Sequence, residues 1–512
     1  MSYAYYEYIE DRGDRLFTVV LLPEREGGFP TVVCRSPYVK NTVDQDENDV
    51  VRACENTYAP WLLRGYAVVF QHCRGQGKST GAFVPYVHER EDGLLLRRWI
   101  RGRSFYNGEL FLLGASYTAS LHYATAPFEA DVKGAVFEVQ DTERYRLWYR
   151  NAQMRKGHAN WHFGLYKSKC GLNKSFGMSS FSELPLDGLS ERVLGDRACD
   201  FEEMLRAGDP EHPFWGTRNG GAEAKNAVKN AGIPILLTTG YNDFYCGGLF
   251  RMWEEMDGEA KKRCALLVSP YNHGDGYSVD RGIAFEKGKR VENFGASYRI
   301  DWFDNIRFGT PLPFEKGVIS YYRTFENGWQ TDFHAVPTRE LELPLGKGVG
   351  TFCYDPAHPT AFCGEGTFAD EFNPEGSVIT LYTVPFAHDV FVKGRMRARL
   401  AVESDRPDTT FYMRVSIEKP GGDYVLRHDI TSLSHQLGDY EENSRVELEM
   451  CFDEYAFLLR SGERLRVDIA GTDDNIYVCH TNRRGEYYLQ DGTDIALNTV
   501  YLCDLVLILP VE

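Results

Sequence analysis

The sequence lacks the features that would place this chain in a membrane or on a nucleic acid. No apolar run approaches the roughly 18 residues that a transmembrane helix needs. The segment Met1–Arg15 contains neither the basic region nor the apolar core of a secretory signal. Lysine and arginine are not clustered and the net charge is −17, which disfavours phosphate-rich or anionic partners. We therefore expect a cytoplasmic protein with no nucleic-acid or membrane partner.

The 12 cysteines also lack any C-x-x-C spacing, the pattern typical of zinc and redox sites. They are scattered through the chain, which indicates buried free thiols in a reducing compartment. We accordingly predict that the protein uses no metal and no cofactor.

One glycine-rich loop needs to be separated from a nucleotide-binding loop. Gly77-Lys78-Ser79 follows an apolar strand, as the end of a P-loop does. The P-loop spacing requires glycine at position 72, which is His72, and the stretch that ends at Pro85 cannot continue as a phosphate-binding helix. The sequence therefore argues against nucleotide binding here.

The most informative stretch is NGELFLLGASYTASL, residues 107–121. An apolar run with the length of a buried strand precedes Gly114, and Ser116 follows two residues later. A helix-favouring segment begins at Tyr117. Strand, tight turn with a central serine, and helix are the layout of a nucleophile elbow, although the last glycine of G-x-S-x-G is replaced by Thr118.

Two further polar residues follow strands later in the chain. Ile233–Thr239 predicts a strand that leads to Asp243, and Cys264–Ser269 predicts one that leads to His273. Catalytic groups of open α/β sheets lie at the carboxyl ends of strands, and Ser, acid, His is the chain order of α/β-hydrolases. We therefore expect Ser116, Asp243 and His273 to lie close together.

Length and patterning divide the chain into several units, because 512 residues exceed one hydrophobic core. Alternating strands and helices over residues 1–125 and 225–335 predict a parallel α/β sheet covered on both faces. Residues 126–224 break this rhythm and predict a helical cap insertion, whose aromatic side chains form either a pocket lining or, as the favoured reading, a core of their own. Turn-separated strands over residues 336–512 predict an all-β sandwich, with the jelly roll favoured.

At the start of the chain, Arg15–Leu22 and Thr31–Cys34 are β-rich and are joined by a turn-prone segment. This arrangement predicts an antiparallel opening hairpin between them.

With these pieces placed, the chain resembles the CocE/NonD family of serine hydrolases, which includes cocaine esterases and X-prolyl dipeptidyl aminopeptidases. The resemblance covers nearly the whole length, from about Arg15 onward, and agrees with the α/β-hydrolase core, helical cap and C-terminal jelly roll expected above. The matching motifs are Arg35–Tyr38, Arg74–Gly81, Gly114–Tyr117, Gly240–Asp243, Pro270–His273, Lys393–Arg395 and Ser404–Phe411.

The resemblance implies a role for each site residue. Ser116 would be the nucleophile, His273 the general base and Asp243 the acid that orients it. The Tyr38 hydroxyl and the Tyr117 backbone N–H would form the oxyanion hole.

The chain departs from the family pattern at two positions near these motifs. Ala119 stands where glycine is usual, and His72 stands where aspartate is usual. Neither change removes a catalytic group.

The resemblance and the triad predict a serine hydrolase of carboxylesterase type that cleaves ester or amide bonds through an acyl-enzyme. The alternatives are an X-Pro dipeptidyl aminopeptidase, or a catalytically idle hydrolase that binds carbohydrate. The partner would be a small ester, amide or short peptide, and the sequence is compatible with a homo-oligomer.

The substrate class is only partly indicated. Phe244–Gly248, which follows the predicted acid, contains no carboxylate to pair with a substrate ammonium group. We therefore expect neutral acyl or aryl esters to be preferred over α-amino-acid esters, unless Glu138, Asp141 or Glu143 of the insertion supplies the missing charge.

Overall fold

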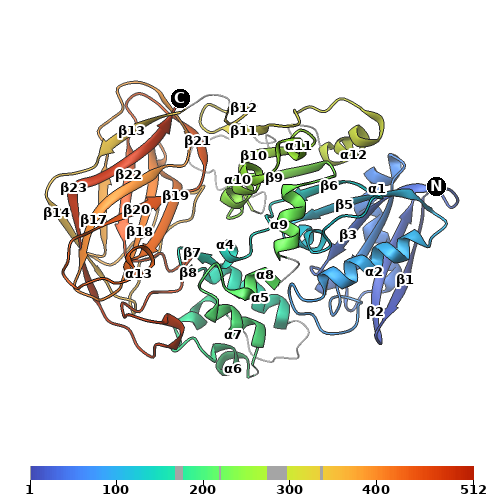
Figure 1. Ribbon diagram of the computed structural model, residues 1–512, viewed down its shortest axis with the longest axis horizontal. Helices are drawn as coiled ribbons and strands as arrows, with labels where there is room; N and C mark the ends of the chain where they lie inside the picture. Colours follow the sequence, from blue (N-terminus) through green and yellow to red (C-terminus); the bar gives the residue numbers. More distant parts are fainter. Residues whose placement is uncertain (1, 168–176, 196, 218–220, 274–296, 335–337) are drawn as a thin grey trace.

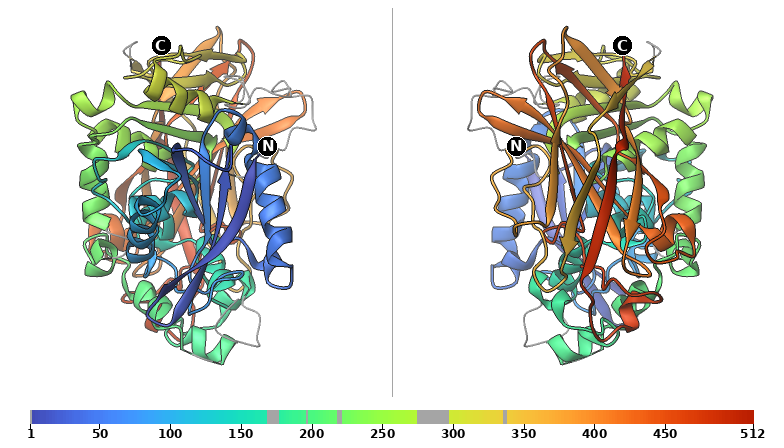
Figure 2. Two further views of the ribbon diagram at one scale, coloured as in Figure 1. Left: turned by 90° about the vertical axis from the view of Figure 1, so that its right-hand side faces the viewer. Right: turned by 90° about the vertical axis from the view of Figure 1, so that its left-hand side faces the viewer.

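Figure 1 shows a computed structural model of the chain, which describes residues 2–167, 177–195, 197–217, 221–273, 297–334 and 338–512. An α/β unit containing the N-terminus lies on one side and an antiparallel β-domain containing the C-terminus lies on the other (Figure 1). Short helices of the cap lie below and between them, and Figure 2 shows the same units from both sides. The predicted combination of α/β core, helical insertion and antiparallel β-domain is confirmed.

The described part of the α/β unit is built on a ten-stranded sheet. In the spatial order given next, the strands from β4 to β11 run parallel, and antiparallel strands complete both edges. In spatial order the strands are β1 (Tyr3–Asp11), β2 (Asp14–Leu22), β4 (Ala67–His72), β3 (Phe29–Ser36), β5 (Tyr106–Ala115), β6 (Val132–Glu138), β9 (Ile235–Asn242), β10 (Ala265–Asn272), β11 (Ile319–Arg323) and β12 (Gly328–Gln330).

Both faces of this sheet are covered, which explains the continuous apolar runs in its central strands. On β5, Phe111 packs in one buried cluster with α1 (Glu47–Leu63) and α12 (Tyr298–Phe308). Its neighbours Leu110 and Leu112 point the other way. They pack with α2 (Glu89–Arg101), α3 (Tyr117–Tyr123), α9 (Gly221–Lys229) and α10 (Cys246–Glu255). Short α11 (Gly258–Lys261) precedes β10.

The opening hairpin differs from the one predicted. β2 pairs with β1 through a tight turn in which Arg12 and Gly13 both have positive φ, 51° and 89°. β4 then separates β2 from β3, so the expected pairing of the second and third strands is wrong. The reason is burial: nearly every residue of β3 is buried, so it lies between two parallel neighbours rather than in an edge hairpin.

The cap begins later than the sequence indicated. β6 lies inside the range assigned to the insertion, yet it is a central strand that pairs with β5 and β9. It was missed because no helix follows it directly. The other predicted boundaries stay predictions. The described cap elements before α9 are α4 (Tyr145–Trp148), β7 (Tyr149–Arg150), β8 (Gln153–Met154), α5 (Lys156–Lys167), η2 (Met178–Ser182), α6 (Leu189–Leu194), α7 (Cys199–Arg206) and α8 (Pro213–Thr217).

The C-terminal domain is an antiparallel sandwich of two sheets. Leu400 and Val402 of one sheet share a buried cluster with Met413 and Val415 of the other. The first sheet contains β13 (Arg339–Pro344), β14 (Val349–Tyr354), β16 (Val390–Gly394), β17 (Arg397–Ser404), β20 (Val446–Cys451), β21 (Tyr455–Leu459) and β23 (Ala496–Val511). The second contains β15 (Val378–Tyr382), β18 (Thr410–Lys419), β19 (Gly422–Ser432) and β22 (Leu465–Ala470).

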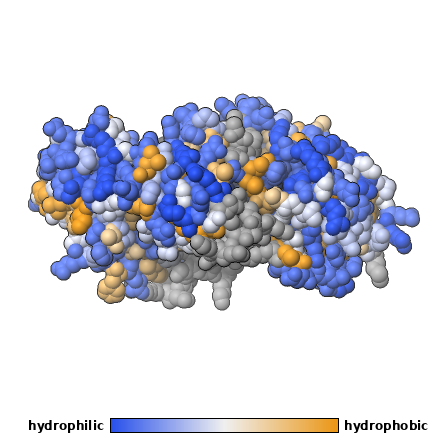
Figure 3. All heavy atoms as spheres, turned by 90° about the horizontal axis from the view of Figure 1, so that it is seen from below, coloured by the Kyte–Doolittle hydropathy of each residue, from blue (hydrophilic) through white to orange (hydrophobic). Residues whose placement is uncertain are grey.

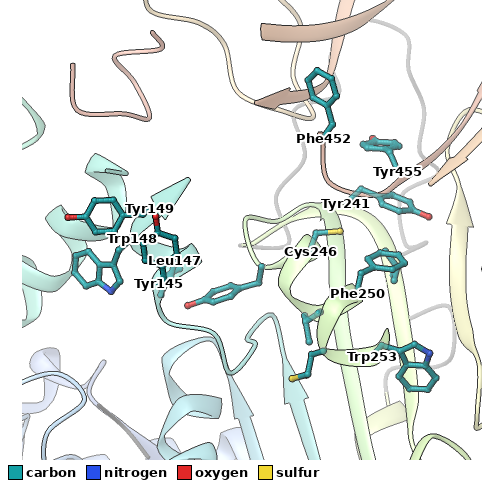
Figure 4. Packing of buried hydrophobic residues seen from close by; sticks show 14 of the residues in the cluster. Tyr145, Leu147, Trp148, Tyr149, Tyr241, Cys246, Phe250, Trp253, Phe452 and Tyr455 are labelled. Atoms are coloured by element: carbon teal, nitrogen blue, oxygen red, sulfur yellow. The ribbon is translucent and has the colours of Figure 1, made fainter. Parts of the chain in front are cut away.

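The three units pack against one another around a shared interior. Buried residues of all three units belong to one continuous cluster, and Figure 4 shows two parts of it: a group of cap residues that includes Tyr149, and a separate group in which Tyr241 of the α/β unit lies beside Tyr455 of the β-domain. The rings of Tyr241 and Tyr455 stack with their centroids 4.6 Å apart. The β-domain is therefore part of the same hydrophobic interior as the hydrolase sheet.

A second contact, which we call the cap–β-domain seam, joins residues 154–156 to residues 476–478 by backbone hydrogen bonds. Val478 N donates to Met154 O at 2.9 Å, and Lys156 N donates to Ile476 O at 2.8 Å. Between them Arg155 forms an antiparallel bridge with Tyr477. The start of α5 is thereby fixed to the β-domain.

The face of the molecule seen from below is largely hydrophilic where it is coloured (Figure 3). Figure 3 shows hydrophilic side chains over most of the coloured face seen from below, with apolar residues in small separate groups. Within the described residues, no helix has the length and apolar character needed to cross a bilayer.

The described cysteines are all free thiols, as predicted, but they are not all buried. Cys34, Cys73 and Cys264 are examples of the buried group. The exposed ones are Cys199, Cys353, Cys451 and Cys503. The expectation of uniform burial is therefore wrong.

Candidate active site

Ser116 occupies a strained turn between β5 and α3. Its backbone has φ 55° and ψ −134°, a conformation that a non-glycine residue adopts at a cost of about 1–3 kcal/mol. This is the geometry of a nucleophile elbow, which lifts the serine hydroxyl above the carboxyl end of the sheet.

The residues around the elbow explain how this chain tolerates its unusual motif. A Cβ on Gly114 would lie 2.5 Å from the carbonyl oxygen of Thr118, so only glycine fits there. The Thr118 hydroxyl accepts from Ala115 N at 2.6 Å and donates to Ala115 O at 2.7 Å, which closes the turn from inside. Ala119 is fully buried in the core. Thr118 and Ala119 therefore support the turn in place of the usual glycines.

Ser116, His273 and Asp243 form one hydrogen-bonded chain. The Ser116 Oγ lies 2.9 Å from His273 Nε2, and His273 Nδ1 lies 3.1 Å from Asp243 Oδ1. With Nδ1 protonated, the imidazole donates to the carboxylate and Nε2 accepts the serine proton. The three residues that the sequence placed at strand ends do lie together.

Asp243 is held from several sides. Its side chain is fully buried, and it accepts from Tyr245 N at 3.0 Å and from the Thr239 hydroxyl at 3.3 Å. A Cβ on Gly240 would lie only 2.0 Å from the carbonyl oxygen of Tyr271. This close approach of the ends of β9 and β10 brings the aspartate and histidine loops together.

Tyr38 lies beyond the end of β3, with its hydroxyl at the same site. Trp161 Nε1–H donates to the Tyr38 oxygen at 3.1 Å. Burial around the phenol raises the pKa of Tyr38 to about 12, while hydrogen bonds with Trp161 and Ser116 act in the opposite direction. The hydroxyl therefore keeps its proton at neutral pH and can donate it.

The phenol of Tyr117 is engaged away from the site, whereas its backbone N–H is not. Its N–H belongs to the first residue of α3, where it has no partner within the helix. Its phenol points away, donating to Glu89 Oε1 at 2.7 Å and accepting from Tyr86 N at 2.8 Å. The side chain thus anchors the N-terminus of the helix beside Ser116.

A cavity of about 920 Å³ opens onto Ser116 and is lined by all three units. The cap supplies His158 and Trp161 from α5, so some of its aromatic residues line a pocket, contrary to the favoured reading. Others, such as Phe163, belong to a core. The β-domain supplies a wall that sequence reasoning missed, made of Gly364, Glu365, Arg427, His428, Asp453, Asn475 and Ile476.

The carboxylates of this wall are already paired. Glu365 lies 2.7 Å from Arg427 and 2.9 Å from His428, which together lower its pKa although burial alone would raise it. Asp453 lies 3.0 Å from Arg150 and 3.7 Å from Arg251. Burial would raise the pKa of Asp453, but the arginines around it hold that pKa well below its usual range.

Glu138, Asp141 and Glu143 are the three acids that could have supplied a carboxylate for a substrate ammonium group. None of them lines the main cavity. Glu138 binds Arg299 at 2.6 Å and also accepts from Tyr298. Glu143 faces Arg146 at 3.5 Å. Asp141 is buried beside α10 and lines two small neighbouring cavities instead.

The glycine-rich loop at residues 72–81 is occupied by internal contacts. Arg74 binds Asp11, Asp14 and Asp92 at 2.6–2.8 Å. His72 Nδ1 accepts from Lys78 N at 3.1 Å, an acceptor role that a carboxylate could also fill. The loop therefore has a structural role, consistent with the argument against a P-loop.

The fold and the hydrogen-bonded triad define a serine hydrolase of the α/β-hydrolase class. The profile described as X-Pro dipeptidyl-peptidase (S15 family) matches residues 12–275, and the X-Pro dipeptidyl-peptidase C-terminal non-catalytic domain matches residues 318–503. The chain belongs to this family and is a CocE/NonD hydrolase, as the sequence motifs predicted.

The relatives agree with this assignment. Cocaine esterase of Rhodococcus sp. (strain MB1 Bresler) is 23% identical, over 92% of this chain and 91% of that protein. An α-amino acid ester hydrolase has the same fold, with a TM-score of 0.80 at 16% identity over 100% and 97% of the two chains. An aminopeptidase from a marine sediment Thaumarchaeota archaeon gives 0.78 at 17% identity over 100% and 96%. These proteins have different substrates, so the family fixes hydrolysis of esters or peptides and not the substrate.

Proposed function

We propose that this chain is a carboxylic ester hydrolase that works through an acyl-enzyme on Ser116, with His273 as general base and Asp243 as its orienting acid. The observation that carries the proposal is the continuous hydrogen-bonded path from Ser116 Oγ through the imidazole to Asp243, at 2.9 and 3.1 Å. A neutral serine is a weak nucleophile at pH 7, and this path supplies the base that it needs.

The chemistry follows in two halves. Ser116 Oγ attacks the ester carbonyl carbon while its proton moves to His273 Nε2. The bond to the leaving alcohol breaks as His273 returns that proton to the alcohol oxygen. Water then attacks the acyl-enzyme with His273 again taking the proton, and the acid is released. Asp243 stays ionised and holds the imidazole in the required tautomer.

The negative charge that develops on the carbonyl oxygen is stabilised by two donors, the Tyr38 hydroxyl and the Tyr117 N–H. The raised pKa of Tyr38, about 12, keeps its proton available. Trp161 supports this role, because its N–H fills an acceptor position of the phenol and leaves the phenolic proton to be donated.

The lining of the cavity supports esters without an α-ammonium group over amino-acid esters and X-Pro peptides. Both carboxylates that the β-domain contributes, Glu365 and Asp453, are paired with arginines. An ammonium group entering here would have to compete with those arginines or lose its hydration without a partner. The X-Pro dipeptidyl aminopeptidase remains the second candidate on family grounds.

Labelling with a fluorophosphonate probe and a substrate panel test the proposal. We expect the probe to modify Ser116, with labelling lost in Ser116→Ala. In the panel, phenyl esters of simple acids should be hydrolysed with higher kcat/KM than phenylglycine phenyl ester or aminoacyl-prolyl anilides. An unlabelled protein, or one that prefers the aminoacyl-prolyl anilides, would overturn it.

A further inference from the structure

Three arginines line the main cavity, and among the described residues Arg155 is the one whose side chain has no hydrogen-bond or ion-pair partner. It is half-buried, its Nε is buried without a hydrogen-bond acceptor, and it forms no ion pair. The other two arginines in the same lining are used internally. Arg150 binds Asp429 at 2.7 Å and Asp453 at 3.0 Å, and Arg427 binds Glu365 at 2.7 Å.

The position of Arg155 is fixed even though its guanidinium is not engaged. It lies in the middle of the cap–β-domain seam, where its N–H donates to Trp148 O at 2.7 Å and its backbone pairs with Tyr477. Hydrogen bonds of Met154 and Lys156 flank it on both sides. Such a backbone presents a side chain in one direction, as a preorganised binding group requires.

The surroundings leave a cation to be neutralised. Arg155 also lines a small cavity of about 10 Å³ that shares Phe244, Tyr245 and Asp453 with the main one. Besides Asp453, already engaged by Arg150 and Arg251, the carboxylate in this lining is Asp141. Burial raises the pKa of Asp141 to about 7, so it is only partly ionised at neutral pH.

Arg427, which lines the same cavity and has a structural role, is engaged differently. Arg427 donates to the carbonyl oxygens of Asp453 and Glu454 as well as pairing with Glu365. The Arg155 side chain donates to no carbonyl or carboxylate oxygen of the described chain, although its Nε is buried away from solvent. Burial of a donor without an acceptor is unfavourable unless a ligand supplies that acceptor.

We propose that Arg155 binds a carboxylate of the substrate. The enzyme then prefers esters that carry a negative charge a few bonds from the scissile carbonyl, on the acyl or on the alcohol side. A guanidinium offers two parallel N–H donors that match a carboxylate, which makes it suited to this task. The inference rests on the proposed ester hydrolase function and names its substrate class.

The first experiment compares esters of matched size. Phenyl valerate is neutral, monophenyl glutarate carries a carboxylate on the acyl side, and 3-(carboxymethyl)phenyl valerate carries one on the alcohol side. A second pair, phenyl caproate and monophenyl adipate, changes the reach of the acyl carboxylate. For each, kcat/KM is measured with the enzyme-free rate subtracted.

We expect at least one anionic ester to exceed its neutral partner by roughly 10–100-fold in kcat/KM, the scale of one hydrogen-bonded charge pair. Arg155→Gln should remove most of this preference and change kcat/KM for phenyl valerate by less than about 3-fold. Arg155→Lys keeps the positive charge but loses the two parallel N–H donors of the guanidinium, so it should retain part of the preference for the anionic ester. Whichever carboxylate is preferred identifies the side on which it binds.

A matched control is Arg206→Gln. Arg206 is also a cap arginine, on α7, but it pairs with Asp187 and does not line the cavity. This variant should keep the full preference. Equal kcat/KM for neutral and anionic esters in the parent enzyme would refute the proposal, as would equal losses on both substrates in Arg155→Gln.

Binding to Ser116→Ala separates the two proposals. Calorimetric titration of this variant with monophenyl glutarate should give a Kd about 10-fold lower than the double variant that also carries Arg155→Gln. If the ester binds through Arg155 but the parent enzyme hydrolyses no ester, the proposed function fails and the carboxylate site stands. If esters are hydrolysed and Arg155→Gln leaves Kd unchanged, the carboxylate site fails alone.

Discussion

The contact between Trp161 and Tyr38 gives the sharpest test of the proposed oxyanion hole. Trp161 Nε1–H donates to the Tyr38 oxygen at 3.1 Å, and the phenol stays protonated because its pKa is about 12. Tyr38→Phe removes one of two oxyanion donors, which should lower kcat by roughly 10²–10³-fold with little change in KM. Trp161→Phe removes the hydrogen bond that orients the phenol and keeps an aromatic ring in its place. One such bond contributes about 0.5–1.5 kcal/mol, so kcat should fall by roughly 2–12-fold.

The two substitutions should not be additive. If Trp161 acts on the transition state through the Tyr38 hydroxyl, Trp161→Phe has no further effect on kcat once Tyr38→Phe is present. The assay is a double-mutant cycle in which kcat and KM are measured for four proteins with one phenyl ester.

Trp161 also stacks on His158, with ring centroids 4.8 Å apart, so a change in KM alone would report substrate packing. An equal fall in kcat with and without the Tyr38 hydroxyl would show that Trp161 acts by another route. That result would refute the proposal that Trp161 orients the Tyr38 hydroxyl.

Three further predictions test how the site is built. Ser116→Ala should fold normally and retain less than about 0.1% of kcat, and Asp243→Asn should lose about 10⁴-fold by favouring the wrong imidazole tautomer; steady-state kinetics with circular dichroism as a folding control checks both. Gly240→Ala would place a Cβ 2.0 Å from Tyr271 O, so we expect both a lower Tm, by the equivalent of about 1–3 kcal/mol, and a lower kcat. Burial raises the pKa of Asp141 from 3.8 to about 7, so the folded state holds a proton that the unfolded state has lost, and stability falls as pH rises from about 4 to about 7. Asp141→Asn should therefore raise Tm more at about pH 8 than at about pH 5, and an equal effect at both would show that this carboxyl does not titrate in that range.

The fold and the triad could be predicted from the sequence because both depend on local patterns of apolar and polar residues. Each of Ser116, Asp243 and His273 follows an apolar strand, and the carboxyl ends of parallel strands meet at one edge of a sheet. In such cases the position of a residue can be predicted from the local sequence pattern alone, because neither a distant contact nor a side-chain rotamer has to be known. Their catalytic roles stay predictions until they are tested.

What could not be predicted depends on contacts between distant parts of the chain. Arg150 and Asp453 are 303 positions apart, and no periodicity links them. Trp161 stands in an aromatic stretch that reads equally well as a small core, and only the position of α5 beside Tyr38 gives it a partner. The strand β6 and the order of β2 and β3 were missed for a related reason, because pairing in a sheet is set by burial on both faces rather than by adjacency in sequence.

The cap–β-domain seam has a consequence for how an active enzyme first comes into being. Ser116, Asp243 and His273 are all translated before the β-domain, yet Asn475 and Ile476, which complete the cavity wall, lie in the later part of that domain. Domains generally fold as units during synthesis, N-terminal first. We therefore expect a ribosome-bound chain to carry a complete triad long before it has a complete substrate cavity, so that selective hydrolysis begins only after the β-domain has emerged.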